Sequence, residues 1–149
     1  MQLTQKERDL IKDLKDQEQL CIDKYSKHAE CASDSQLKAL FTGISGTERQ
    51  HLETLTQIEN GTVPPVGNAD KPLPTFHPTY STTETPQKKN DCYLCTDLLT
   101  TEKHASHLYD TCVFEFDNQG VRKVLASIQE EEQQHGKAIY DYMKVNSMY

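Results

Sequence analysis

The chain lacks tryptophan, long apolar runs and clusters of basic residues. None of its apolar runs approaches the roughly 18 residues that a membrane-spanning helix needs. Its 16 lysines and arginines are scattered among 23 acidic residues and leave a net charge of -7, whereas phosphate binding needs clustered positive charge. We therefore expect an acidic, soluble protein that binds neither membranes nor nucleic acid.

Proline is absent from residues 1–60 and 91–149, because all six prolines lie between Gly61 and Asn90. This distribution divides the chain into two helical arms and one long connector. Thr4 followed by Glu7 is typical of a helix start, and Gly61 is typical of a helix end. The apolar pattern predicts helices over residues 4–32, 35–60, 91–117 and 120–146, in hairpins 4–60 and 91–146 joined by a Pro-rich crossover at 61–90.

The two arms repeat one design, because a shift of 84 positions aligns them without a gap. Apolar residues that step by three and four along one helix face coincide in both arms. Two hairpins joined by about 30 residues are typical of a four-helix bundle with one long crossover. The alternative, two units on a flexible linker, is disfavoured because each hairpin is too small for its own core. We predict an all-α protein with a single domain over residues 1–149.

The inward stripe of each predicted helix is interrupted by an acid, or by an acid and an imidazole. Each arm carries one glutamate and, thirty residues later, a Glu-x-x-His pair whose side chains share a helix face. Four buried carboxylates need protons or cations, and two divalent ions balance their charge. Carboxylate with imidazole suits iron or manganese, and zinc fits the same ligands. A solvated salt-bridge pattern is the alternative to a metal site at Glu18, Glu48, His51, Glu102, Glu132 and His135.

The chain resembles the ferritin-like superfamily and, within it, the spore coat protein F family of endospore-forming bacteria. The resemblance covers residues 9–60 and 91–149 and is closest in the second arm. It implies a ferritin-like bundle in which Glu48 and Glu132 bridge two metal ions, while Glu18, Glu102, His51 and His135 each bind one. It rests on Asp16-Gln17-Glu18-Gln19, Thr47-Glu48-Arg49-Gln50-His51, Asp97-Leu98-Leu99-Thr100-Thr101-Glu102-Lys103-His104 and Glu130-Glu131-Glu132-Gln133-Gln134-His135-Gly136.

Tyr25 and Tyr109 lie seven residues beyond the two lone glutamates, as a tyrosine does in rubrerythrin-like proteins. A phenol in this position is expected to hydrogen-bond a ligand carboxylate and fix its orientation. An ordinary buried aromatic is the equally weighted alternative. Gly43 and Gly46, inside the second predicted helix, suggest a close approach of another helix or a local bulge before Glu48.

The five cysteines are an odd number in a chain that needs no disulfides, which favours a reducing compartment. Cys92 and Cys95 are predicted at the start of the third helix, where the helix dipole lowers a thiol pKa. One such pair cannot form a four-cysteine iron site, so we expect no rubredoxin-like electron donor within these residues. Cys21 is expected to be a small buried thiol. Surface positions are expected for Glu130, Glu131, His28, His77, His104 and His107.

Two functions remain open on the sequence. In the first, the paired ions react with oxygen or peroxide, which gives oxidase, peroxidase or catalase-like activity. In the second, the protein is a structural spore coat or assembly component, and the metal site stabilises the bundle or is vestigial. The resemblance implies other coat proteins or further copies of the chain as partners, and assembly into the spore coat. Cytoplasmic synthesis is expected because Met1 to Glu7 lack a secretory apolar stretch.

Overall fold

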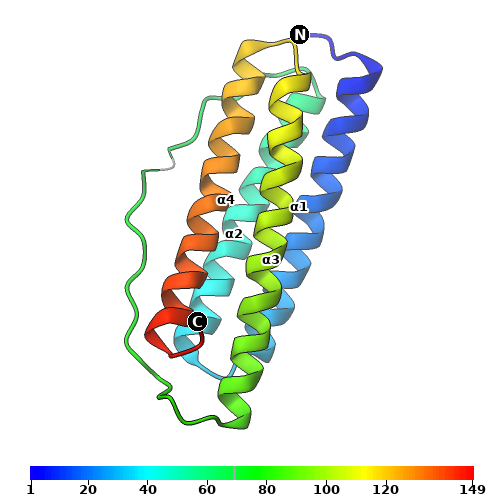
Figure 1. The fold of residues 1–149 in the computed structure, drawn as a ribbon. Coiled ribbons are helices and arrows are strands. Elements are labelled where there is room, and N and C mark those ends of the chain that lie inside the picture. The colour runs from blue at the N-terminus through cyan, green and yellow to red at the C-terminus, as the bar shows by residue number, and fades with distance from the viewer. Residues whose placement is uncertain (69) are drawn as a thin grey trace.

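The protein is built from α-helices packed side by side. A computed structural model describes residues 1–68 and 70–149, and within these residues it contains four helices and no strand. Figure 1 shows the helices as two antiparallel hairpins that lie against each other. The predicted all-α class is confirmed by α1 (Gln5–Cys31), α2 (Ser35–Glu59), α3 (Pro86–Glu115) and α4 (Gln119–Val145).

Each helix begins after a polar residue whose side chain accepts a hydrogen bond from a backbone N–H of the first turn. Thr4 accepts from the N–H of Glu7 at 3.2 Å, and the Glu7 carboxylate accepts from the N–H of Thr4 at 2.8 Å. This pair is the capping box expected from the sequence. Asp34, Thr85 and Asn118 cap the other three helices.

The third helix begins at Pro86, five residues before its predicted start at residue 91. Proline suits the first turn of a helix because the N–H that it lacks has no partner there. The Thr85 side chain accepts from the N–H of Lys88 at 3.1 Å and fixes this start. Cys92 consequently lies in the second turn of α3 rather than at its N-terminus.

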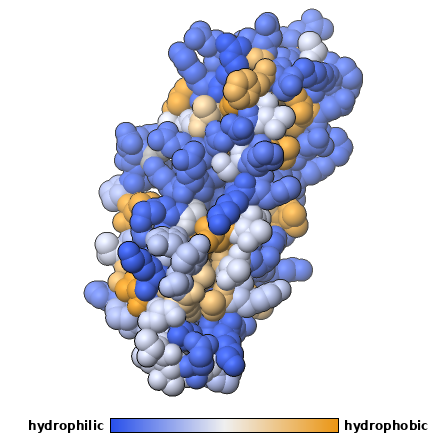
Figure 2. Space-filling model, in the orientation of Figure 1, coloured by the Kyte–Doolittle hydropathy of each residue, from blue (hydrophilic) through white to orange (hydrophobic). Residues whose placement is uncertain are grey.

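The apolar core forms two layers, one toward each end of the bundle. One layer includes Ile11 and Leu125, the other includes Phe41 and Leu98, and all four helices contribute to both. Both hairpins therefore share one core, because neither layer is complete without the other hairpin. Buried ionisable side chains occupy the space between the layers. The face in Figure 2 is mainly hydrophilic, with separate apolar patches, as expected for helices that each bury one stripe.

Between α2 and α3, residues 60–68 and 70–85 run along the outside of the bundle, beside α4 (Figure 1). The Ser127 hydroxyl donates to the carbonyl of Gly67 at 3.1 Å near the start of this connector. Near its end, the N–H groups of Thr79 and Tyr80 donate to Asn146 Oδ1 at 2.7 and 2.9 Å. The connector thus starts α3 at the same end of the bundle as α2 (Figure 1).

Gly43 and Gly46 lie within the continuous helix α2. A side-chain carbon added at either position would meet no atom within 4 Å, apart from its own helix backbone and chain neighbours. The prediction that another helix approaches closely here is therefore wrong. No bulge interrupts α2 before Glu48.

Candidate metal centre

Six ionisable side chains from all four helices meet in the layer between the two apolar cores. α1 and α3 each supply one glutamate, while α2 and α4 each supply a glutamate and, one turn later, a histidine. Their exposed fractions range from 0% to 9%. The structure thus brings together all six residues predicted as ligands: Glu18, Glu48, His51, Glu102, Glu132 and His135.

The six side chains form two overlapping groups. In each group, one ligand atom from every member lies within 4.8 Å of the others. Glu48 and Glu132 belong to both groups, so these two carboxylates lie between the two positions. The first group is completed by Glu18 and His51, and the second by Glu102 and His135.

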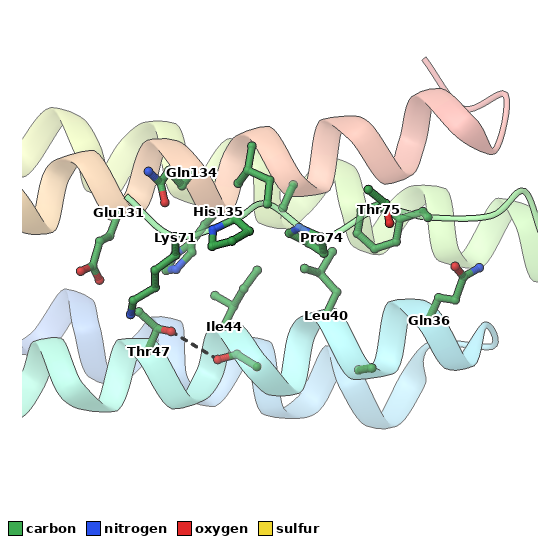
Figure 3. A pocket seen from close by; sticks show the side chains of 16 residues that line it. Gln36, Leu40, Ile44, Thr47, Lys71, Pro74, Thr75, Glu131, Gln134 and His135 are labelled. Carbon is green, nitrogen blue, oxygen red and sulfur yellow. Dashed lines mark hydrogen bonds between the residues drawn. The ribbon is translucent and has the colours of Figure 1, made fainter. Parts of the chain in front are cut away.

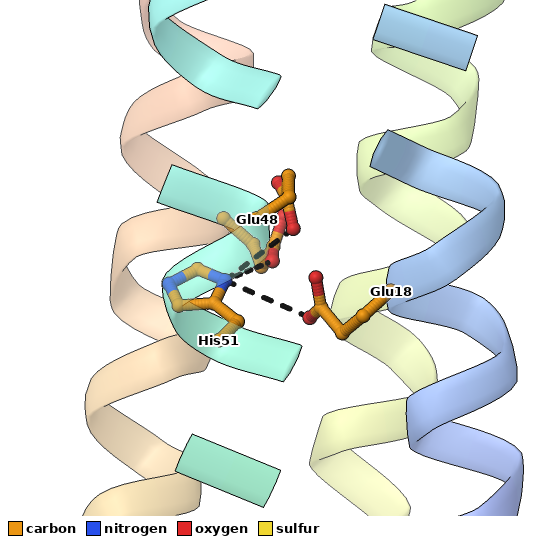
Figure 4. Close-up of side chains that lie close together, drawn as sticks. Glu18, Glu48 and His51 are labelled. Atoms are coloured by element: carbon orange, nitrogen blue, oxygen red, sulfur yellow. Dashed lines mark hydrogen bonds and ion pairs between the residues drawn. The ribbon is translucent and has the colours of Figure 1, made fainter. Parts of the chain in front are cut away.

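The imidazole of His51 lies between the carboxylate cluster and a further acid. Its Nδ1 lies 3.0 Å from Glu132 Oε1 and 3.3 Å from Glu48 Oε2. Figure 4 shows this nitrogen directed toward Glu18, whose Oε1 is 3.6 Å away. On the other side of the ring, Nε2 lies 2.7 Å from Glu131 Oε2. A cation in the first group would therefore face Nδ1, with Nε2–H donating to Glu131.

The imidazole of His135 faces the second group. Its Nδ1 lies 3.0 Å from Glu48 Oε1 and 3.4 Å from Glu102 Oε1. Neither contact has hydrogen-bond geometry, so within the described residues both Nδ1 and Glu48 Oε1 lack a hydrogen-bond partner. The same holds for a buried oxygen on each of the other three carboxylates: Glu18 Oε2, Glu102 Oε2 and Glu132 Oε2.

Five unpartnered ligand atoms in one buried layer fit a metal centre. A buried polar atom without a partner costs roughly 1 to 3 kcal/mol, and an unpaired charge costs more. Bound divalent cations would satisfy these oxygens and this nitrogen together. The donor set of hard oxygens and imidazole nitrogens is suited to first-row divalent ions.

Protons provide the charge balance within the cluster when cations do not. Burial raises the pKa of Glu18 to about 8, the neighbouring Glu48 carboxylate adds to the rise, and His51 opposes it. Burial also acts to raise the pKa of Glu48, but its interactions with Glu18, His135 and His51 outweigh burial and hold it well below its ordinary value. The two carboxyl groups interact strongly, so the proton that they bind belongs to the pair.

The pKa values of three further cluster residues are also shifted by burial and by neighbouring carboxylates. Burial and the neighbouring Glu102 raise the pKa of Glu132 well above its ordinary value. Burial lowers the pKa of a histidine, yet the surrounding carboxylates outweigh it and raise the pKa of His51 and His135 well above the usual range. Cations entering the cluster would therefore displace protons from carboxyl groups and imidazoles alike.

Two tyrosines hydrogen-bond the lone glutamates across the bundle. The Tyr25 hydroxyl on α1 donates to Glu102 Oε1 on α3 at 2.5 Å, and the Tyr109 hydroxyl on α3 donates to Glu18 Oε1 on α1 at 2.5 Å. Burial raises the pKa of both phenols well above 10, so they remain donors. The expected bond to a candidate ligand is present, and each tyrosine serves the hairpin other than its own.

Glu131 is a site residue that the sequence analysis missed. The run of acids before Glu132 predicted a solvated face, but Glu131 is half-buried and contacts His51. Hydrogen bonding to His51 lowers the pKa of Glu131 against the opposing effect of burial. The repeat carried no signal for this role, because the equivalent position in the first arm is Thr47.

His28 also differs from its predicted surface position. It is half-buried, and its Nε2 lies 2.8 Å from Asp97 Oδ2 on α3, where Lys24 Nζ lies 3.0 Å from the same oxygen. The other three histidines predicted at the surface, His77, His104 and His107, are exposed as predicted.

The thiols depart from prediction at one point. Cys95 is fully buried, and burial raises its pKa, so the expected lowering by the helix dipole is wrong for this residue. Cys21 is buried, as expected for a small core thiol. All five cysteines are free.

Fold and site together define an all-helical protein with buried Glu/His clusters able to hold metal ions. Residues 90–149 match the family model of the Coat F domain, which supports the resemblance to spore coat protein F for the second hairpin. Comparisons with curated proteins and with solved structures gave no match. Among the described residues, no helix combines the length and apolar character needed to cross a membrane. The matched part contains Glu102, Glu132 and His135, half of the candidate ligands.

Proposed function

We propose that the protein is a ferritin-like dinuclear metal protein with a spore coat role. Glu48 and Glu132 would be shared by two divalent ions, while Glu18 with His51 and Glu102 with His135 would complete the two positions. The observation that carries this proposal is the pair of overlapping buried groups that share these two carboxylates.

Charge and donor type support iron or manganese as the bound ions. Four carboxylates balance two divalent cations without any further counter-ion in the apolar interior. Carboxylate oxygens with one imidazole per position suit both metals, and zinc can occupy the same donors without redox chemistry. Iron or manganese, when bound, supplies one-electron redox chemistry toward oxygen or peroxide.

The chain's own residues hold and orient the donors. The phenols of Tyr25 and Tyr109 hold Oε1 of Glu102 and Glu18, while Oε2 of each carboxylate has no hydrogen-bond partner among the described residues. Glu131 accepts from His51 Nε2 and so keeps Nδ1 directed inward. The apolar layers above and below shield the cluster from water toward the two ends of the bundle.

Metal content of the purified protein tests the proposal. Protein produced without added metal, and then loaded with iron or manganese, is expected to retain two ions per chain after gel filtration. Glu48→Ala should lose this stoichiometry, whereas Glu53→Ala, an exposed acid on the same helix, should retain it. Equal metal content in both variants, or none in the parent, would refute the dinuclear site.

A structural coat function without turnover is the second candidate, and the Coat F match favours it. In that case the ions stabilise the bundle, and the outer surface contacts other coat proteins or further copies of the chain. Peroxide consumption by the iron- and manganese-loaded protein separates the two candidates. Turnover that disappears in Glu48→Ala supports redox activity, while bound metal without turnover supports the structural function.

A further inference from the structure

Two cavities reach the candidate centre from the surface. The first, the α2–α4 cavity, has a volume of about 490 Å³ and lies beneath connector residues 71–76 (Figure 3). The second, the α3–α4 cavity, has the same volume and lies between the helices of the second hairpin. Cavities of this size accommodate small molecules.

Both cavities are lined by members of the second group. His135 lines the α2–α4 cavity, and Glu102 and Glu132 line the α3–α4 cavity. His135 and Glu102 are particular to the second group, and Glu132 is common to both groups. Glu18 and His51, which are particular to the first group, line neither cavity.

The two histidines also differ in their surroundings. Glu131 closes the outer side of His51, with its Oε2 at 2.7 Å from Nε2. The repeat places Thr47 at the equivalent position for His135, and the Thr47 hydroxyl instead donates to the carbonyl of Gly43 at 3.4 Å. His135 is 9% exposed and His51 is 3% exposed. The first position is thus enclosed by protein, and the second faces open space.

We propose, on the basis of the dinuclear centre proposed above, that the two ion positions are inequivalent. The position of Glu102 and His135 exchanges its ion and binds small external ligands, while the position of Glu18 and His51 is protected. The ligands are small, weakly polar molecules that enter through the cavities.

The lining of the α2–α4 cavity supports this ligand class. Leu40, Ile44 and Leu73 form part of a mainly carbon wall. Near His135, the Lys71 ammonium and the Glu131 carboxylate both line the cavity, so it carries one charge of each sign there. An entry of this kind offers no net charge to attract a strongly charged ligand.

Iron release and nitric oxide binding test the inequivalence. Protein loaded anaerobically with iron(II) is first assayed for iron content and then mixed with an excess of ferrozine, whose coloured complex reports release. We expect a fast and a slow phase of equal amplitude. Nitric oxide, followed by electron paramagnetic resonance, should bind once per iron pair.

Variants assign the phases to the two positions. Glu131→Gln should speed the slow phase by about tenfold, because it removes the carboxylate behind His51. Thr47→Glu should slow the fast phase, because it supplies His135 with the carboxylate that it lacks. Circular dichroism and thermal melting confirm that each variant is folded.

A cavity-filling pair tests the route. Gly43 lines the α2–α4 cavity and Gly136 lines the α3–α4 cavity. The double variant Gly43→Leu with Gly136→Leu should slow nitric oxide binding several-fold. Gly46→Leu is the matched control, because Gly46 also has open space around it but lines neither cavity.

The outcomes separate this inference from the function on which it rests. Iron content of two per chain with single-phase release, or with two nitric oxide molecules per pair, overturns the inequivalence alone. A lack of bound iron, manganese or zinc overturns the dinuclear centre and the inequivalence together. Equal rates in the double variant and the Gly46→Leu control overturn entry through the cavities.

Discussion

The Tyr109 hydroxyl on α3 donates to Glu18 Oε1 on α1, 91 residues away in the sequence, at 2.5 Å. Tyr25 makes the reciprocal bond to Glu102, so each hairpin supplies the donor for the other hairpin's lone glutamate. These two bonds tie α1 to α3 at the level of the cluster. The arrangement of the centre therefore depends on the hairpins being docked together.

Removal of either hydroxyl should destabilise the metal-free protein. Tyr25→Phe and Tyr109→Phe should each lower the free energy of unfolding by about 1 to 3 kcal/mol, because a buried carboxyl loses its donor. Urea denaturation measures the loss. Tyr93→Phe, at a tyrosine that is 70% exposed, is the control and should change little. Unchanged stability in both core variants would contradict the described hydrogen bonds.

Metal binding should strengthen as pH rises. Glu18, with a pKa of about 8, and the two histidines, whose pKa values are raised, all lose protons when cations bind. Proton uptake at these groups stabilises the metal-free fold at low pH, and this contribution is lost as pH rises through their folded-state pKa values. The melting temperature of the metal-free protein should thus decrease as pH rises from about 6 to about 9. The increase in melting temperature on metal loading should become larger over the same range. A metal-induced increase that shrinks over this range would contradict the account.

The two glycines of α2 should be replaceable with a gain in stability. Gly43→Ala and Gly46→Ala should each raise the free energy of unfolding by about 0.5 to 1 kcal/mol, because alanine restricts the unfolded chain and meets nothing within 4 Å. Thermal and urea unfolding measure the change. Gly61→Ala is the contrasting variant: φ at Gly61 is 87°, so this substitution should be destabilising. Destabilisation by both α2 substitutions would show that the space around them is filled.

Asp97 should contribute modestly to the contact between α1 and α3. Burial acts to raise its pKa, but hydrogen bonds from Lys24 and His28 outweigh burial and lower it. Asp97→Asn should lower the free energy of unfolding by about 0.5 to 1.5 kcal/mol at neutral pH, since the contacts of Asp97 with Lys24 and His28 are partly exposed. A lowered pKa stabilises the fold at higher pH, so the difference between parent and variant should vanish as pH falls through this pKa. A difference that is constant with pH would refute the ion-paired state of Asp97.

The sequence predicted the helices and the six candidate ligands because both follow periodic rules. A period near 3.6 places Glu48 and His51 on the inward face of one helix, and the 84-residue repeat identifies Glu132 and His135 as their counterparts. The start of α3 was harder to predict, because a proline such as Pro86 fits both a connector and the first turn of a helix.

Features that depend on how the hairpins dock lay beyond sequence patterns. The crossing of Tyr25 to Glu102 requires the relative placement of α1 and α3, which no local spacing encodes. Glu131 has no acidic counterpart in the first arm. The repeat that identified Glu132 therefore gave no indication of a role for Glu131. The two cavities arise from gaps between helices and are likewise invisible in a one-dimensional pattern.

Anomalous X-ray diffraction from crystals of the iron- or manganese-loaded protein tests the central claim most directly. The account predicts two anomalous peaks in the buried layer, one within Glu18, Glu48, His51 and Glu132, and one within Glu48, Glu102, Glu132 and His135. Loaded crystals without a peak in this layer would contradict it.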